Sequence, residues 1–84
     1  MADSEKFKIT VNNKLVFLKE KEQTGFSIKK SAIEQGVDIK IDFVLSVVEK
    51  DGTTADDIKD DEPIEIYDDQ IFVAVDPEDN AWFN

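Results

Sequence analysis

One segment of this 84-residue chain, between Thr24 and Gly36, has the spacing of an amphipathic helix, and strand-like segments lie on both sides of it. Ile28, Ala32 and Ile33 share one helix face. The Thr24 hydroxyl is suited to capping the first turn, and Gly36 to the left-handed residue that ends the helix. A lone helix buries its apolar side only against another element, so a sheet must cover it. The side chains expected to point away from that sheet are Lys29, Lys30 and Glu34.

The clearest strand pair precedes the helix. Apolar and polar residues alternate through residues 7–11, which is the period of a half-buried strand. Asn12-Asn13 follows, and because Asn tolerates positive φ, the pair predicts a two-residue hairpin turn. Residues 15–18 form the expected return strand.

Three further strands are expected after the helix. Residues 43–48 are a β-branched run that ends before a turn at Asp51-Gly52. Residues 51–61 are polar and predict a loop with one irregular turn at most. Residues 64–66 and 71–75, joined at Asp68-Asp69, predict a second hairpin.

The predicted fold is therefore α+β, with the order β-β-α-β-β-β. A mixed sheet of four or five strands curls around one helix, as in the β-grasp (ubiquitin-like) fold, with the last strand beside the first. We expect a disordered N-terminus at residues 1–6, a domain at residues 7–75 and an acidic, aromatic tail at residues 76–84.

The charge of the chain limits the kinds of macromolecule that it is expected to bind. The chain has 20 acidic residues and 10 basic ones, all of them lysine, for a net charge of −10. Residues 1–48 carry 8 lysines and 7 acids (+1), whereas residues 49–84 carry 2 lysines and 13 acids (−11). No nucleic-acid partner is expected, because phosphate contacts need a basic surface. The acidic half either keeps the protein soluble or steers a basic partner.

Residue types argue against an enzyme. The chain has no histidine and no cysteine, which excludes Ser-His or Cys-His nucleophilic catalysis and the usual zinc sites. No glycine-rich phosphate loop occurs, so no cofactor is expected. With Gly52 at the sixth position of an EF-hand loop, Val47 and Ile58 fall where carboxylate ligands are needed, so no metal is expected either. No run of 18 apolar residues predicts a membrane span, and the acidic N-terminus does not read as a secretory signal. We expect a cytoplasmic protein.

Four stretches resemble bacterial ubiquitin-like domains of the multiubiquitin type: ITVNNKLV, TGFSIKKSAIEQG, IKDDEPIEI and DDQIFVAVDPEDN. The resemblance implies a protein modifier of a bacterial ubiquitination-like pathway linked to antiviral defence. Its implied partners are activating-enzyme-like, conjugating-enzyme-like and JAB-type peptidase proteins. In that chemistry the modifier's C-terminal carboxylate is adenylated, passed to an enzyme thiol and joined to an amine. The alternative is a non-covalent interaction module that is never conjugated.

The resemblance assigns conjugation and enzyme recognition to the tail, with Asn84 as the reacting carboxylate. The chain departs from the Gly-Gly end of ubiquitin, because its three glycines are at positions 25, 36 and 52. Three explanations of the terminal aromatics stay open: a recognition element, a segment that folds back over the core, or incidental residues. The tail residues concerned are Asp76, Pro77, Trp82, Phe83 and Asn84.

A second candidate surface lies on the sheet. If Leu45 and its alternate neighbours, Phe43 and Val47, pack on the helix, the intervening side chains face outward and form a patch for a protein partner. Phe72 joins this patch if residues 71, 73 and 75 point inward. The alternative is that the curled sheet or the returning tail covers these side chains. The patch consists of Val44, Ser46, Val48 and Phe72 on a protein expected to be monomeric when free.

Overall fold

A computed structural model describes residues 6–49 and 51–77, in which seven strands and one helix are found. The predicted α+β class and its element order are confirmed, with two strands added, β3 and β5. The elements are β1 (Phe7–Val11), β2 (Lys14–Leu18), β3 (Glu22–Thr24), α1 (Gly25–Glu34), β4 (Val44–Val48), β5 (Thr54–Ile58), β6 (Pro63–Glu65) and β7 (Gln70–Val75).

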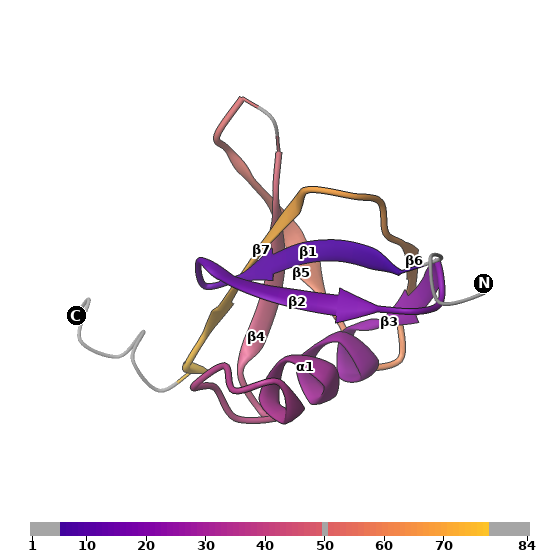
Figure 1. The fold of residues 1–84 in the computed structure, drawn as a ribbon. Helices are drawn as coiled ribbons and strands as arrows, with labels where there is room; N and C mark the ends of the chain where they lie inside the picture. Colours follow the sequence, from indigo (N-terminus) through magenta and orange to yellow (C-terminus); the bar gives the residue numbers. More distant parts are fainter. Residues whose placement is uncertain (1–5, 50, 78–84) are drawn as a thin grey trace.

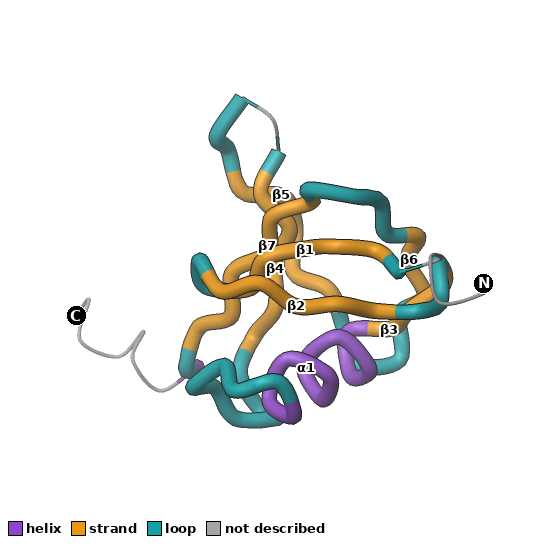
Figure 2. Tube along the Cα trace, in the orientation of Figure 1, coloured by secondary structure: helices purple, strands orange, loops and turns teal. Residues whose placement is uncertain are grey.

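The main sheet is mixed and has the strand order β2-β1-β7-β4-β5, while β3 and β6 form a separate pair. β7 is parallel to β1 and antiparallel to β4, so the last strand lies in the centre beside the first, as predicted. α1 lies against one face of this sheet only (Figures 1 and 2). The arrangement is β-grasp-like.

The N-terminal hairpin forms as the sequence predicts. Asn12 and Asn13 have φ values of 52° and 70°, which the tight turn requires. Asn12 also ties the hairpin to β7: its Nδ2 donates to the Ala74 carbonyl at 3.0 Å, and its Oδ1 accepts from the Ala74 amide at 2.8 Å. Its backbone N–H donates to the Phe72 carbonyl at 3.1 Å. One side chain thus continues the β1–β7 pairing past the end of β1.

The predicted ends of the helix are confirmed. The Thr24 hydroxyl accepts a hydrogen bond from the Ser27 amide at 3.1 Å, and the Ser27 hydroxyl accepts one from the Thr24 amide at 2.8 Å. This reciprocal capping box satisfies donors that the first turn leaves free. Gly36, with φ of 99°, follows the C-cap residue Gln35.

The core lies between α1 and the inner face of the sheet. Its buried side chains come from α1, from the loop after it, from every strand of the main sheet and from the residue that follows β6. The buried apolar residues are Ile9, Val11, Val16, Leu18, Ile28, Ala32, Val37, Ile39, Leu45, Ile58, Ile66, Phe72 and Ala74.

Lys29 corrects the expectation that its side chain points into solvent. It is only 3% exposed, and its Nζ donates to the Phe43 carbonyl and pairs with Asp60 Oδ1, each at 2.7 Å. The chain beyond β5 crosses the helix start closely, since a Cβ on Gly25 would lie 2.4 Å from the Lys59 carbonyl oxygen. This close crossing covers the lysine stem and brings a carboxylate to its ammonium group.

The predicted hairpin of residues 64–66 and 71–75 is wrong, although the chain does turn between them. β6 pairs with β3 instead, with Gln23 opposite Ile64. The Asp69 amide, at a residue with φ of 70°, donates to the Lys8 carbonyl at 2.7 Å. This bond directs the chain onto β1, so β7 cannot fold back along β6.

The predicted loop at residues 51–61 is also wrong, because it contains β5. This strand pairs antiparallel with β4, with Leu45 opposite Ile58 and Ser46 opposite Asp57. The segment lacks the apolar alternation of a strand. It is held by backbone pairing to the otherwise open edge of β4, which local sequence does not reveal.

The buried Lys29 ammonium generates a stability prediction. Asp60→Ala should lower the free energy of unfolding by about 2 kcal/mol, because it leaves a buried charge with one acceptor. The loss falls below that of a fully buried pair because Asp60 is 60% exposed. The double variant Lys29→Met/Asp60→Ala should be more stable than Asp60→Ala alone, because it removes the buried charge that has lost its carboxylate partner. Urea unfolding measures both values.

Glu34→Ala is the matched control, because the Lys30–Glu34 pair is exposed at both ends. It should cost no more than about 0.5 kcal/mol. A double variant less stable than Asp60→Ala alone would contradict this account of Lys29.

Candidate functional site

The sheet face away from α1 carries apolar side chains on several neighbouring strands. Register places Leu15, Thr10, Ile71 and Val48 in one row across β2, β1, β7 and β4. Leu15 is 54% exposed, and Phe17, Ile71 and Val75 are 45%, 45% and 41% exposed. We call this surface the outer apolar face; it consists of Leu15, Phe17, Val44, Val48, Ile71, Val73 and Val75.

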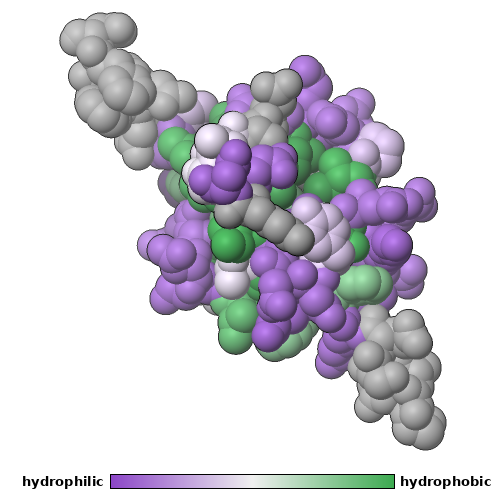
Figure 3. Space-filling model, turned by 90° about the horizontal axis from the view of Figure 1, so that it is seen from above, coloured by the Kyte–Doolittle hydropathy of each residue, from purple (hydrophilic) through white to green (hydrophobic). Residues whose placement is uncertain are grey.

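Figure 3 views the molecule from the side opposite α1. Apolar residues reach the surface there in patches, and hydrophilic residues border and interrupt them. A small isolated domain gains nothing from exposing several large apolar side chains on one face. Such a surface is typical of a protein-binding site.

The predicted orientation of β4 agrees with the structure. Leu45 is fully buried in the core, and Phe43 and Val47 pack against it. Val44 and Val48 are half-buried on the other face. Ser46 belongs to that face but is only 9% exposed, because its hydroxyl donates to Asp57 Oδ1 on β5 at 2.9 Å. It therefore joins β4 to β5 and offers little area to a partner.

The predicted orientation of β7 is inverted. Phe72 is fully buried in the core, whereas Ile71 and Val75 are exposed. Both alternating sets of this strand are apolar, so alternation alone does not fix which set is buried. Register with β1 decides, because it places Phe72 opposite the buried Val11.

Acidic side chains lie beside this face. Asp57 is adjacent to it on β5, and Glu49 follows β4. Asp68 Oδ1 accepts from the Lys8 amide at 3.0 Å, and Asp69 pairs with Lys8 Nζ at 3.4 Å. Asp68 and Asp69 therefore attach the turn before β7 to β1.

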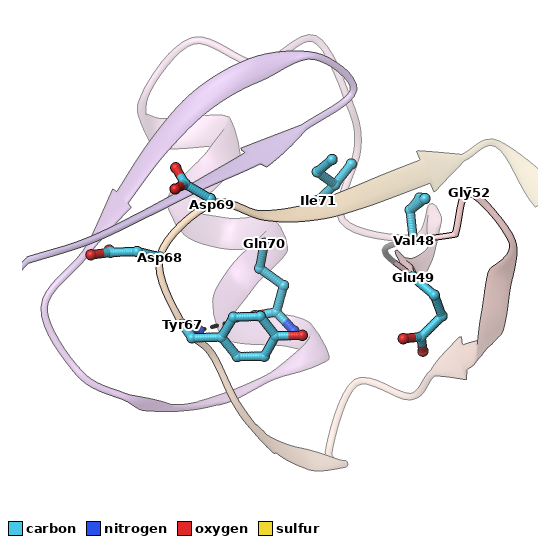
Figure 4. Close-up of a pocket in the computed structure, with 8 residues that line it drawn as sticks. All are labelled: Val48, Glu49, Gly52, Tyr67, Asp68, Asp69, Gln70 and Ile71. Atoms are coloured by element: carbon cyan, nitrogen blue, oxygen red, sulfur yellow. Dashed lines mark hydrogen bonds between the residues drawn. The ribbon is translucent and has the colours of Figure 1, made fainter.

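A groove opens at the edge of the outer apolar face, between the β4–β5 turn and the turn before β7 (Figure 4). The β4–β5 turn is closed by hydrogen bonds from Thr53 to Asp51. The Thr53 backbone amide, followed by its hydroxyl, lowers the pKa of the Asp51 carboxyl below its ordinary value. The residues that line the groove are Val48, Glu49, Gly52, Tyr67, Asp68, Asp69, Gln70 and Ile71.

The tail candidates fall mostly outside the described residues. Asp76 is half-buried and Pro77 is exposed where the chain leaves β7. Trp82, Phe83 and Asn84 lie outside the described ranges, as do residues 1–5 of the expected disordered N-terminus. The assignment of function to the tail stays a prediction.

No metal-binding arrangement of three or more acidic side chains is found in residues 6–49 and 51–77. In the same ranges, no helix has the length and apolar character that crossing a bilayer requires.

Comparisons with protein-family models, with curated protein sequences and with solved structures gave no match for this chain. The resemblance to bacterial ubiquitin-like domains therefore stays a prediction from short stretches of sequence.

The sequence pattern missed Leu15, Phe17, Ile71 and Val75 as surface residues. One signal would have found them: LVFL (residues 15–18) and IFVAV (residues 71–75) are continuous apolar runs, so both faces of these strands are apolar. With one helix available to cover the sheet, no element found in residues 6–49 and 51–77 covers the second face of each run.

The inverted orientation of β7 generates a matched prediction. Phe72→Ala should lower the free energy of unfolding by about 3–5 kcal/mol, because it leaves a cavity in the core. Ile71→Ala, one residue away on the exposed face, should cost less than about 1 kcal/mol. Denaturant unfolding of both variants measures the difference, and equal losses would contradict the assigned faces.

Proposed function

We propose that this protein is a ubiquitin-like interaction module that binds a protein partner through the outer apolar face. The observation that supports this function most is the row formed by Leu15, Thr10, Ile71 and Val48, which crosses four strands in register. The strands hold these side chains in place before binding, which reduces the ordering cost of association. The protein itself supplies no catalytic side chain in this role.

Charge favours a partner of opposite sign. Residues 49–84 carry a net charge of −11, and acids from this half lie beside the outer apolar face. Apolar contacts supply most of the affinity at the centre of an interface, whereas bordering charges raise the association rate and select the partner. The proposed partner therefore has an apolar patch flanked by basic residues.

Site-specific photo-crosslinking in the native host tests this function. A benzoylphenylalanine in place of Ile71 should capture a defined partner, and Leu15→Asp in the same chain should abolish capture. The same crosslinker in place of Ile33, which is 37% exposed on α1, is the control. With the partner in hand, Ile71→Asp should weaken binding about tenfold to thirtyfold, the loss typical of a central apolar contact. Equal capture from both positions would contradict the proposal.

A second candidate function is that of a covalent modifier. It is supported by the β-grasp-like fold, in which β7 is held on both sides and leads directly to the tail at Asp76 and Pro77. In this role the Asn84 carboxylate is adenylated, transferred to an enzyme thiol and joined to a target amine.

Reconstitution with activating-enzyme-like and conjugating-enzyme-like proteins and ATP tests the modifier role. Intact mass should show an adduct equal to the two proteins less one water, and deletion of residues 81–84 should remove it. The deleted chain should keep its partner at the outer apolar face, which separates the two functions. If the full chain forms no adduct, the modifier role is excluded for those enzymes.

A further inference from the structure

We propose that the groove beside the outer apolar face receives an arginine side chain of the bound partner. This inference rests on the proposed function and names the chemistry of the partner. Val48 and Ile71 are register partners on β4 and β7, and both line the groove. The groove is therefore continuous with the outer apolar face, and a partner seated on that face reaches it directly.

Both walls of the groove are fixed by hydrogen bonds. In the turn before β7, the Tyr67 amide donates to Gln70 Oε1 and the Gln70 amide donates to the Tyr67 carbonyl, each at 3.2 Å. In the opposite wall, the Glu49 amide donates to the Thr53 carbonyl at 2.7 Å, and the Gly52 amide donates to the Glu49 carbonyl at 2.9 Å. A ligand therefore meets walls that are already in place.

The groove combines an aromatic ring with a carboxylate. Figure 4 shows the Tyr67 ring and the Glu49 carboxylate on the same side of β7, while Asp68 and Asp69 point away toward β1. Tyr67 is 51% exposed, so its ring is accessible. Within residues 6–49 and 51–77, no lysine lies within ion-pair distance of Glu49. An aromatic ring and a carboxylate that line the same groove offer a bound cation a cation–π contact and an ion pair.

A guanidinium group fits these walls better than an ammonium group. It is planar, stacks on an aromatic ring and is more weakly hydrated, and it offers several donors to a carboxylate. The apolar side chain of Val48, which also lines the groove, is suited to the methylene stem of the same residue.

The composition of this chain shows that the arginine must come from a different protein. None of its 84 residues is arginine, so neither a second copy nor the chain's own tail provides a guanidinium group. A net charge of −10 also disfavours contact between two copies. The occupant is therefore a different protein.

Nuclear magnetic resonance titration of the full, ¹⁵N-labelled chain tests this inference. The probes are acetyl-Leu-Arg-Leu-amide and the same peptide with citrulline in place of arginine. Citrulline has nearly the same shape as arginine but carries no charge. The arginine peptide should shift the amide signals of Glu49, Gly52, Tyr67 and Gln70. The citrulline peptide should bind about threefold to tenfold more weakly, as expected for one exposed cation–π contact with one exposed ion pair.

Glu49→Gln should remove most of the difference between the two peptides. Glu22→Gln is the matched control, because Glu22 is an exposed acid on β3 in the separate two-stranded sheet, and it should leave the difference unchanged. Unchanged signals elsewhere in the spectrum verify that each variant is folded.

Three outcomes would overturn the inference. Equal binding of both peptides with shifts at Ile71 and Val75 would remove the arginine site but support the outer apolar face. Equal binding of a lysine peptide would remove the preference for arginine. No shift with any peptide would overturn the groove as a site, while crosslinking at Ile71 would still decide the proposed function by itself.

Discussion

The structure depends on the central position of β7. This strand pairs with β1 on one side and β4 on the other, and so it joins the N-terminal hairpin to the β4–β5 pair. Asn12 extends the pairing of β7 with the hairpin, because its side chain forms hydrogen bonds with both the amide and the carbonyl of Ala74. Phe72, at the middle of the strand, is the largest of the fully buried side chains. One side of β7 therefore contributes side chains to the core, and its other side contributes side chains to the outer apolar face.

A second constraint follows from having one helix over a five-stranded sheet. α1 covers the inner face, and the described residues provide no second layer for the outer one. Strands with apolar residues on both faces then expose one set, as Ile71 and Val75 do. The same geometry sets the groove between Tyr67 and Glu49 at the border of this exposed set. The outer apolar face and its acidic border thus follow from the fold and require no separate element.

Local chemistry explains why part of the fold was predictable. Asn12-Asn13 suits positive φ, Thr24 caps a helix with its hydroxyl, and Gly36 adopts a left-handed conformation; each depends on its immediate neighbours. The burial of Lys29 was not predictable, because it depends on Asp60, which lies 31 positions along the chain and reaches it through a long-range ion pair. The candidate site was predicted in part: Val44 and Val48 face outward, while Phe72 does not.

The sequence by itself determined the first hairpin, the limits of the helix, the absence of catalytic nucleophiles of the Cys-His or Ser-His type, and the separation of charge between the two halves. Only the tertiary structure decided which apolar side of β7 is buried, that β6 pairs with β3, and that residues 54–58 form a strand. The physical reason is the distance along the chain over which each interaction acts. Turns, caps and charge act over a few residues, whereas strand register and edge pairing are fixed by hydrogen bonds between segments far apart in the chain.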